Sequence, residues 1–133
     1  MAVTITRAAY DSILAQARSQ APLEACGYLL GTDKENATEN YAMTNIDHSE
    51  EHFSLDPKEQ FAAIRYTRQN GLKVVGNWHS HPASPSRPSQ EDIRLAFDPS
   101  ILYFILSLAA AEPVLNAFRI RNGEVEKLAV TII

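Results

Sequence analysis

Apolar residues recur at spacings of three and four near the start of the chain, at Tyr10, Ile13, Leu14 and Ala17. This spacing predicts an amphipathic helix over residues 7–20, with Thr6 as its N-cap. A second helix is predicted from Asp56-Pro57 to Asn70-Gly71, because an N-cap followed by proline opens helices and Asn-Gly commonly closes them. A third, short helix is expected over residues 89–97.

Shorter apolar runs bounded by turn residues predict strands. The runs are residues 3–5, 26–31, 37–45, 72–81, 102–108, 114–121 and 125–132. Asn122-Gly123, between the last two runs, is a typical two-residue hairpin turn. Helices and strands alternate first and strands dominate later, which predicts one α/β domain over residues 1–133. We expect a mixed central sheet flanked by helices.

Composition and charge narrow the classes of function. The chain has 133 residues, of which 45% are hydrophobic, and its net charge is −4 with acids and bases spread along it. Nucleic-acid binding needs clustered Lys and Arg, so we expect no nucleic-acid partner. The longest apolar stretch, residues 101–111, is too short to span a membrane.

The single cysteine and the N-terminus bear on location. Cys26 excludes an internal disulfide framework and fits a reducing compartment. It opens a predicted buried strand, so we interpret it as a core residue rather than a reactive thiol. The first residues lack the basic and apolar regions of a signal peptide, and we expect a soluble cytoplasmic protein.

The segment from His79 to Asp92 contains the candidate chemistry. His79 and His81 are two residues apart on a predicted strand, so their side chains project from one face. Two imidazoles are half of a typical zinc site, and a catalytic zinc needs a third protein ligand and an open position for water. Asp92 is the candidate third ligand, because the proline-rich loop 82–88 reverses direction ahead of its helix. Trp78 should face the opposite side and pack.

These residues also have structural interpretations. The two histidines could be ordinary strand residues with satisfied ring nitrogens. Ser89 and Asp92 match a capping box, Ser-x-x-acid, and we do not expect Asp92 to serve fully both as a cap and as a ligand. Asn45 is interpreted either as a turn residue or as a substrate contact.

A second histidine pattern competes with this one. Residues 48–52, His-Ser-Glu-Glu-His, match the His-x-x-Glu-His zinc pattern of inverted metallopeptidases. That pattern needs a helix to bring both histidines together, and no apolar periodicity surrounds it here. We therefore predict a loop, with contact to substrate or a lid as its more plausible use.

The residue spacing resembles the JAMM (MPN-plus) metallopeptidase family, whose pattern is a glutamate upstream, then His-x-His, seven residues, Ser, two residues and Asp. This chain has Glu24, His79-Ser80-His81, seven residues, and Ser89 three positions before Asp92. The resemblance implies a fold similar to cytidine deaminases. It also implies one catalytic Zn²⁺ with a bound water on His79, His81 and Asp92. Glu24, which alone would pass for a surface glutamate, is implied as general base, and Ser89 as a donor to the oxyanion.

Residues 22–27 and 53–57 look like the compact prokaryotic branch of that family. Members of this branch act on ubiquitin-like sulfur-carrier proteins with Gly-Gly tails. The resemblance thus implies hydrolysis of an amide or isopeptide bond at such a tail, releasing a carrier-bound amino acid such as cysteine or trimming tail residues.

Two other functions compete with this one. The first is a non-catalytic MPN-type scaffold of the same fold, although such scaffolds usually lack the metal ligands. The second is a zinc nucleobase deaminase, which one cysteine excludes because that chemistry uses a Cys-x-x-Cys pair. The carrier, the released residue, gating by residues 48–52 and the oligomeric state, a homo-oligomer included, stay open.

Overall fold

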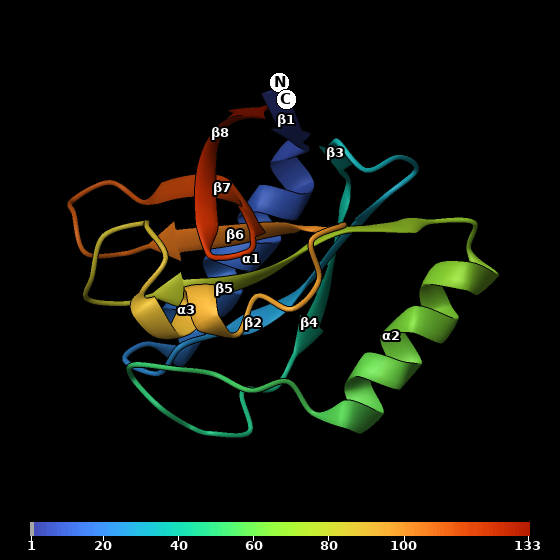
Figure 1. Cartoon of the computed structure of the whole chain (residues 1–133). Helices are drawn as coiled ribbons and strands as arrows, with labels where there is room; N and C mark the ends of the chain where they lie inside the picture. The colour runs from blue at the N-terminus through green and yellow to red at the C-terminus, as the bar shows by residue number, and fades with distance from the viewer. Residues whose placement is uncertain (1) are drawn as a thin grey trace.

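An eight-stranded mixed sheet organises residues 2–133, the part of the chain that this computed structural model describes (Figure 1). The strands are β1 Ala2–Ile5, β2 Cys26–Gly31, β3 Asn36–Ala37, β4 Glu39–Met43, β5 Lys73–His81, β6 Leu102–Ser107, β7 Val114–Arg121 and β8 Glu124–Ile132. Their order across the sheet is β3-β1-β8-β7-β6-β5-β2-β4. β5 pairs with β6 in parallel, whereas β2 pairs with β5 and β6 with β7 antiparallel.

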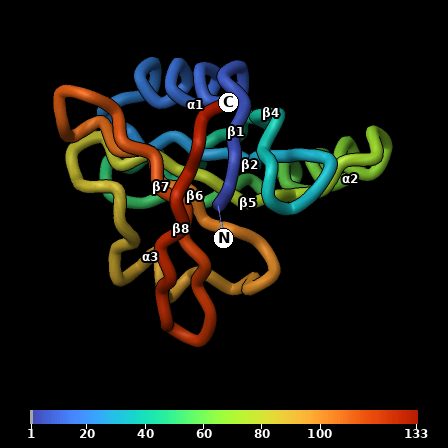
Figure 2. The backbone as a smooth tube through the Cα atoms, turned by 90° about the horizontal axis from the view of Figure 1, so that it is seen from above, coloured from blue at the N-terminus to red at the C-terminus, as the bar shows by residue number. Residues whose placement is uncertain are grey.

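Helix α1, Arg7–Gln20, covers one face of the sheet, as Figure 2 shows. Its Ile13 and Ala17 are fully buried in a core that includes Leu29, Trp78 and Phe104. Burying an aliphatic or aromatic side chain of this size stabilises the fold by about 1.5–3 kcal/mol. The apolar face of the helix and the apolar face of the sheet, each predicted from the spacing of hydrophobic residues, therefore pack in one core.

The other face of the sheet is covered by two separate helices. Helix α2, Pro57–Gln69, packs Ala63 against a cluster around Cys26 and Leu30. Helix α3, Gln90–Arg94, lies at a second cluster built from β6 and β7, where Ile93 packs. A space between the two clusters is therefore left above β5.

Helix ends and turns follow the sequence signals closely. The Thr6 hydroxyl accepts a hydrogen bond from the Ala9 N–H at 3.2 Å and caps α1. Gly71, just past α2, has φ +65°, and Asn122 and Gly123 have φ of +53° and +78°. Two successive positive φ values are what a type I′ hairpin turn requires. The first two predicted helices and the hairpin are confirmed.

Two predicted boundaries are wrong. The run 37–45 forms two strands, β3 and β4, because β3 pairs with β1 and β4 with β2, at opposite edges of the sheet. Only Thr38 separates them, so the sheet curves until its edges approach each other. The helix predicted over 89–97 ends at Arg94, and tighter turns continue to Phe97. Among residues 2–133, no helix is long and apolar enough to cross a membrane.

The two faces of strand β5 have different roles: one packs in the core and the other holds the candidate metal ligands. Trp78 is fully buried on the α1 side, and its Nε1 donates to Asn40 Oδ1 at 2.9 Å, which confirms that it faces away from the histidines. Gly27 makes room for it, since a Cβ there would lie 2.8 Å from Trp78 Nε1. Alternation along the strand then directs His79 and His81 to the opposite face, between α2 and α3.

Candidate metal centre and its groove

Three side chains from β5 and α3 converge on one point. His79 Nε2 and His81 Nε2 lie 3.1 Å apart, and each lies 3.2 Å from Asp92 Oδ2. Ligand atoms about 2.0 Å from a tetrahedral zinc ion stand about 3.3 Å from one another. The three atoms therefore fit a metal ion, and the structure brings together the residues predicted as ligands.

The loop between the ligands fixes the orientation of His81. The Nδ1 of His81 lies 2.8 Å from the carbonyl oxygen of Pro85. When Nδ1 carries the proton and donates it there, the lone pair of Nε2 faces the other two ligand atoms. Ser86 and Ser107 anchor the same loop through hydrogen bonds of 2.6 Å to main-chain carbonyls.

The ring of His79 is held differently. It stacks on Phe53, and its buried Nδ1 has no hydrogen-bond partner among the described residues. Burial lowers the pKa of His79, which favours the neutral imidazole that a metal ligand must be.

Asp92 is both a helix cap and a member of the cluster. Ser89 N–H donates to Asp92 Oδ2 at 2.9 Å, and Asp92 N–H donates to the Ser89 hydroxyl at 3.0 Å. The cap and the cluster share one carboxylate oxygen, which has lone pairs for both; that Asp92 does not serve fully both as a cap and as a ligand stays a prediction. Burial alone would raise the pKa of Asp92, but the two imidazoles beside it outweigh burial and hold this pKa well below its usual range.

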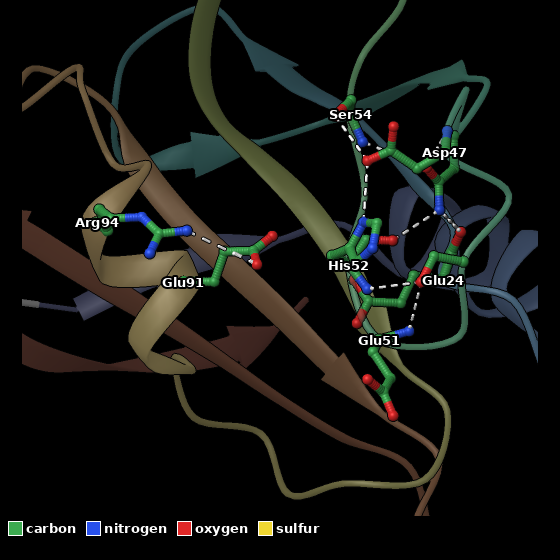
Figure 3. Close-up of polar contacts among 9 residues, drawn as sticks. Glu24, Asp47, Glu51, His52, Ser54, Glu91 and Arg94 are labelled. Atoms are coloured by element: carbon green, nitrogen blue, oxygen red, sulfur yellow. Dashed lines mark hydrogen bonds and ion pairs between the residues drawn. The ribbon is translucent and has the colours of Figure 1, made fainter.

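Glu24 is buried, with 3% of its surface exposed, so its interpretation as a surface glutamate is wrong. It precedes β2 and lies beside the loop shown in Figure 3. Burial raises the pKa of Glu24 to about 8, although attraction to His81 opposes the shift. Its Oε1 has no hydrogen-bond partner among residues 2–133. A carboxyl group with a pKa near neutrality can both take and return a proton.

Asn45 ties Glu24 to the loop that follows β4. Its Nδ2 donates to the carbonyl oxygens of Glu24 and His52, both at 3.0 Å. Its Oδ1 accepts from the N–H groups of Asp47 and Ser54. Every polar group of this buried side chain is therefore bonded to the main chain, which favours the turn interpretation over substrate contact.

The His48–His52 pattern lies in this loop and forms no helix, as predicted. His52 Nδ1 lies 3.0 Å from Asp47 Oδ2, and the Ser54 hydroxyl donates to the same oxygen at 2.7 Å (Figure 3). Within residues 2–133, the group that could hold a metal contains neither His48 nor His52. His52, the second histidine of the pattern, therefore takes part in the hydrogen bonds that organise the loop.

A groove of about 510 Å³ runs from the cluster across the sheet, between α2 and α3. It is lined by Tyr28, Phe53, Ser54, Leu55, Gln60, Asn77, His79, Glu91, Asp92, Leu95, Phe97, Asp98, Ile101, Tyr103, Ile105 and Ile120. The residues of the groove floor were not predicted from the sequence. Strand alternation could have identified Asn77, because it precedes His79 by two residues and so lies on the same face of the strand.

The architecture and cluster match a known family. Residues 6–121 match the prokaryotic homologues of the JAB domain. The chain belongs to this family. The CysO-cysteine peptidase of Mycobacterium tuberculosis is 31% identical over 125 residues, covering 92% of this chain and 86% of that protein. The desampylase of Pyrococcus furiosus is 33% identical over 75 residues, 56% of this chain and 53% of that protein.

Solved structures of the same architecture support the match. Protein DSY2949 from Desulfitobacterium hafniense has a TM-score of 0.89 and 44% identity, covering 98% of this chain and 92% of that one. A structure described as a JAMM metalloprotease-like zinc site in the proteasome and signalosome has a TM-score of 0.59 and 25% identity, covering 98% and 99%. The protein is a JAMM-type hydrolase.

Proposed function

We propose that the protein is a zinc-dependent peptidase acting on the C-terminal Gly-Gly tail of a ubiquitin-like sulfur-carrier protein. It would hydrolyse an amide or isopeptide bond there, releasing a carrier-bound amino acid such as cysteine or trimming tail residues. The convergence of two imidazoles and a carboxylate near a buried glutamate carries this proposal. The names of the CysO-cysteine peptidase and the desampylase support the substrate class. We assign residues 1–133 to one JAMM domain, in a cytoplasmic enzyme.

The cluster His79, His81 and Asp92 would hold Zn²⁺, whose Lewis acidity polarises a carbonyl and lowers the pKa of a bound water. Asp92 remains ionised, and a proton on His81 Nδ1, donated to the Pro85 carbonyl, would leave Nε2 free to bind the ion. Burial alone would lower the pKa of His81, but Asp92 and the Pro85 carbonyl raise this pKa, so the ring would release a proton when Zn²⁺ binds.

Glu24 would move the proton that amide hydrolysis requires. A C–O bond forms between water and the scissile carbonyl carbon, and the C–N bond breaks. The proton that water loses passes to the Glu24 carboxylate and then to the departing amine. Burial, which raises the pKa of Glu24, makes this carboxylate a better base than an exposed one.

Ser89 would stabilise the negative charge that develops on the carbonyl oxygen. Its Oγ already accepts the Asp92 N–H, and its hydroxyl hydrogen remains available for donation. Loss of one such donor slows comparable reactions by about 10²–10³-fold. The cap therefore holds the hydroxyl in place without using the proton that it would donate.

The test replaces the proposed base with its isosteric amide. Glu24→Gln should retain near-stoichiometric zinc and lower turnover of a carrier–cysteine conjugate by at least about 10²-fold, read by mass spectrometry. Glu124→Gln, on exposed β8, is the matched control and should cleave normally. Undiminished cleavage by Glu24→Gln would remove Glu24 from the mechanism. Absence of near-stoichiometric zinc in carefully purified wild-type protein would favour the scaffold alternative.

A further inference from the structure

The groove floor contains a carboxamide without hydrogen-bond partners. Asn77 lies on β5 between Tyr28 of β2 and Tyr103 of β6, its cross-strand neighbours. Its Oδ1 is buried and unpaired, and its side chain makes no hydrogen bond with any described residue. The Tyr28 hydroxyl accepts from Gln60 Nε2, the Tyr103 hydroxyl donates to the carbonyl oxygen of Asp98, and neither is bonded to Asn77.

Such an arrangement is unfavourable in the free protein. A buried polar group left unpaired lowers stability relative to an apolar group of the same shape. Asn40, on β4 of the same sheet, has three side-chain partners: Ser12, Gln16 and Trp78. The contrast suggests that the partner of Asn77 is a bound molecule.

Strand pairing gives the groove a direction. β2 and β5 are antiparallel, with Cys26 opposite His79 and Tyr28 opposite Asn77. Glu24 precedes Cys26 by two residues, so it lies near the His81 end of β5. Asn77 lies in the opposite direction from His79 along the same strand. Neither Glu24 nor His81 lines the groove. The groove therefore leads away from the residue that returns a proton to the departing amine.

Charge supports the same direction. The described residues that line the groove include Glu91, Asp92 and Asp98 but no Lys or Arg, although Arg94 lies 3.9 Å from Glu91 outside the lining. A released amino acid has a free α-carboxylate, which this lining would repel. The acyl side of a tail continues as chain into the folded carrier and has no such group.

We propose that the groove holds the carrier tail on the acyl side of the scissile bond, and that Asn77 positions the tail by hydrogen bonding one of its backbone peptide groups. This inference rests on the proposed function. Asn77 and His79 are two residues apart on a strand, about 6.6 Å. An extended tail has the same rise, so the contacted peptide group lies about two residues before the scissile bond. A carboxamide suits this task because it offers both a donor and an acceptor.

The protein side of the test is Asn77→Leu, which keeps shape and removes both polar atoms. The melting temperature should not fall, because an unpaired buried oxygen is lost. The kcat/KM for a tailed carrier should fall about tenfold. Asn40→Leu is the matched control: it should lower the melting temperature, since it removes bonds that exist.

The substrate side replaces tail peptide groups by esters, one at a time, in semisynthetic carriers. An ester removes the N–H and weakens the carbonyl as an acceptor. In the wild type and in Asn40→Leu, one ester about two residues before the scissile bond should lower kcat/KM at least about fivefold. In Asn77→Leu the same ester should cost less than about twofold.

The outcomes separate the two proposals. If the wild type cleaves tailed carriers but each ester costs the same in wild type and Asn77→Leu, the role of Asn77 is overturned and the proposed function stands. If the wild type cleaves no tailed carrier, the proposed function fails and this inference fails with it.

Discussion

The imidazole of His79 stacks on the ring of Phe53, with 4.6 Å between ring centroids and 24° between planes. Phe53 sits between His52, whose carbonyl accepts from Asn45, and Ser54, whose N–H donates to Asn45. Asn45 thus fixes the position of the Phe53 ring, and the Phe53 ring in turn fixes the orientation of the His79 imidazole. The stacking contact with Phe53 takes the place of the hydrogen bond that a ligating histidine usually makes through its second ring nitrogen.

Phe53→Ala should therefore weaken zinc binding. Without the stack, His79 can rotate, and losses of orienting groups around metal ligands typically cost about 10–100-fold in affinity. Competition with a chromophoric chelator measures the zinc dissociation constant. Phe61→Ala removes a phenylalanine that is 67% exposed on α2 and should leave this constant unchanged. Equal zinc affinity in all three proteins would mean that the stack does not orient His79.

Asn45→Ala should destabilise the protein. It leaves the carbonyl oxygens of Glu24 and His52 without the side-chain donor that each has now. Unpaired buried groups cost about 1–3 kcal/mol each, so the free energy of unfolding should fall by about 2–4 kcal/mol in urea titrations. Asn70→Ala removes one exposed bond to Tyr66 and should cost below about 1 kcal/mol. A change in Asn45→Ala no larger than this control would rule out the bridging role.

Local signals in the sequence predicted most of the fold. Thr6, Asp56-Pro57 and Asn122-Gly123 each act through backbone geometry over a few residues, so their effect can be inferred without the rest of the chain. The side-by-side placement of His79 and His81 follows from strand alternation alone. The place of Asp92 within reach of both follows from a loop whose length and prolines are visible in the sequence.

The remaining features depend on contacts between distant segments. β3 and β4 separate at Thr38 because their partners, β1 and β2, lie in different parts of the sheet. The burial of Glu24 depends on a loop more than twenty residues further along, through Asn45. Asn77 looks like an ordinary strand residue until its Oδ1 proves to be buried without a partner among the described residues.

Cys26 provides a check on the core that is independent of catalysis. Burial raises the pKa of the Cys26 thiol to about 12, with smaller contributions from Glu59 and Glu24. The thiolate is the reactive form, so at pH 8 the native protein should react with a thiol reagent far more slowly than the protein unfolded in urea. Chromophoric thiol titration measures both rates. Rapid labelling of folded protein would contradict the interpretation of Cys26 as a core residue.

The two roles of Asp92 can be separated by paired substitutions. Asp92→Asn keeps a side-chain oxygen able to accept the Ser89 N–H but lacks the charge that a metal ligand supplies. It should therefore fold with nearly unchanged stability and lose zinc, measured by elemental analysis. Asp92→Ala removes the capping oxygen as well, so it should lose zinc and also about 0.5–2 kcal/mol of unfolding free energy. Near-stoichiometric zinc in Asp92→Ala would mean that the carboxylate serves only the helix, because a group that contributes nothing to the metal can be deleted without losing it.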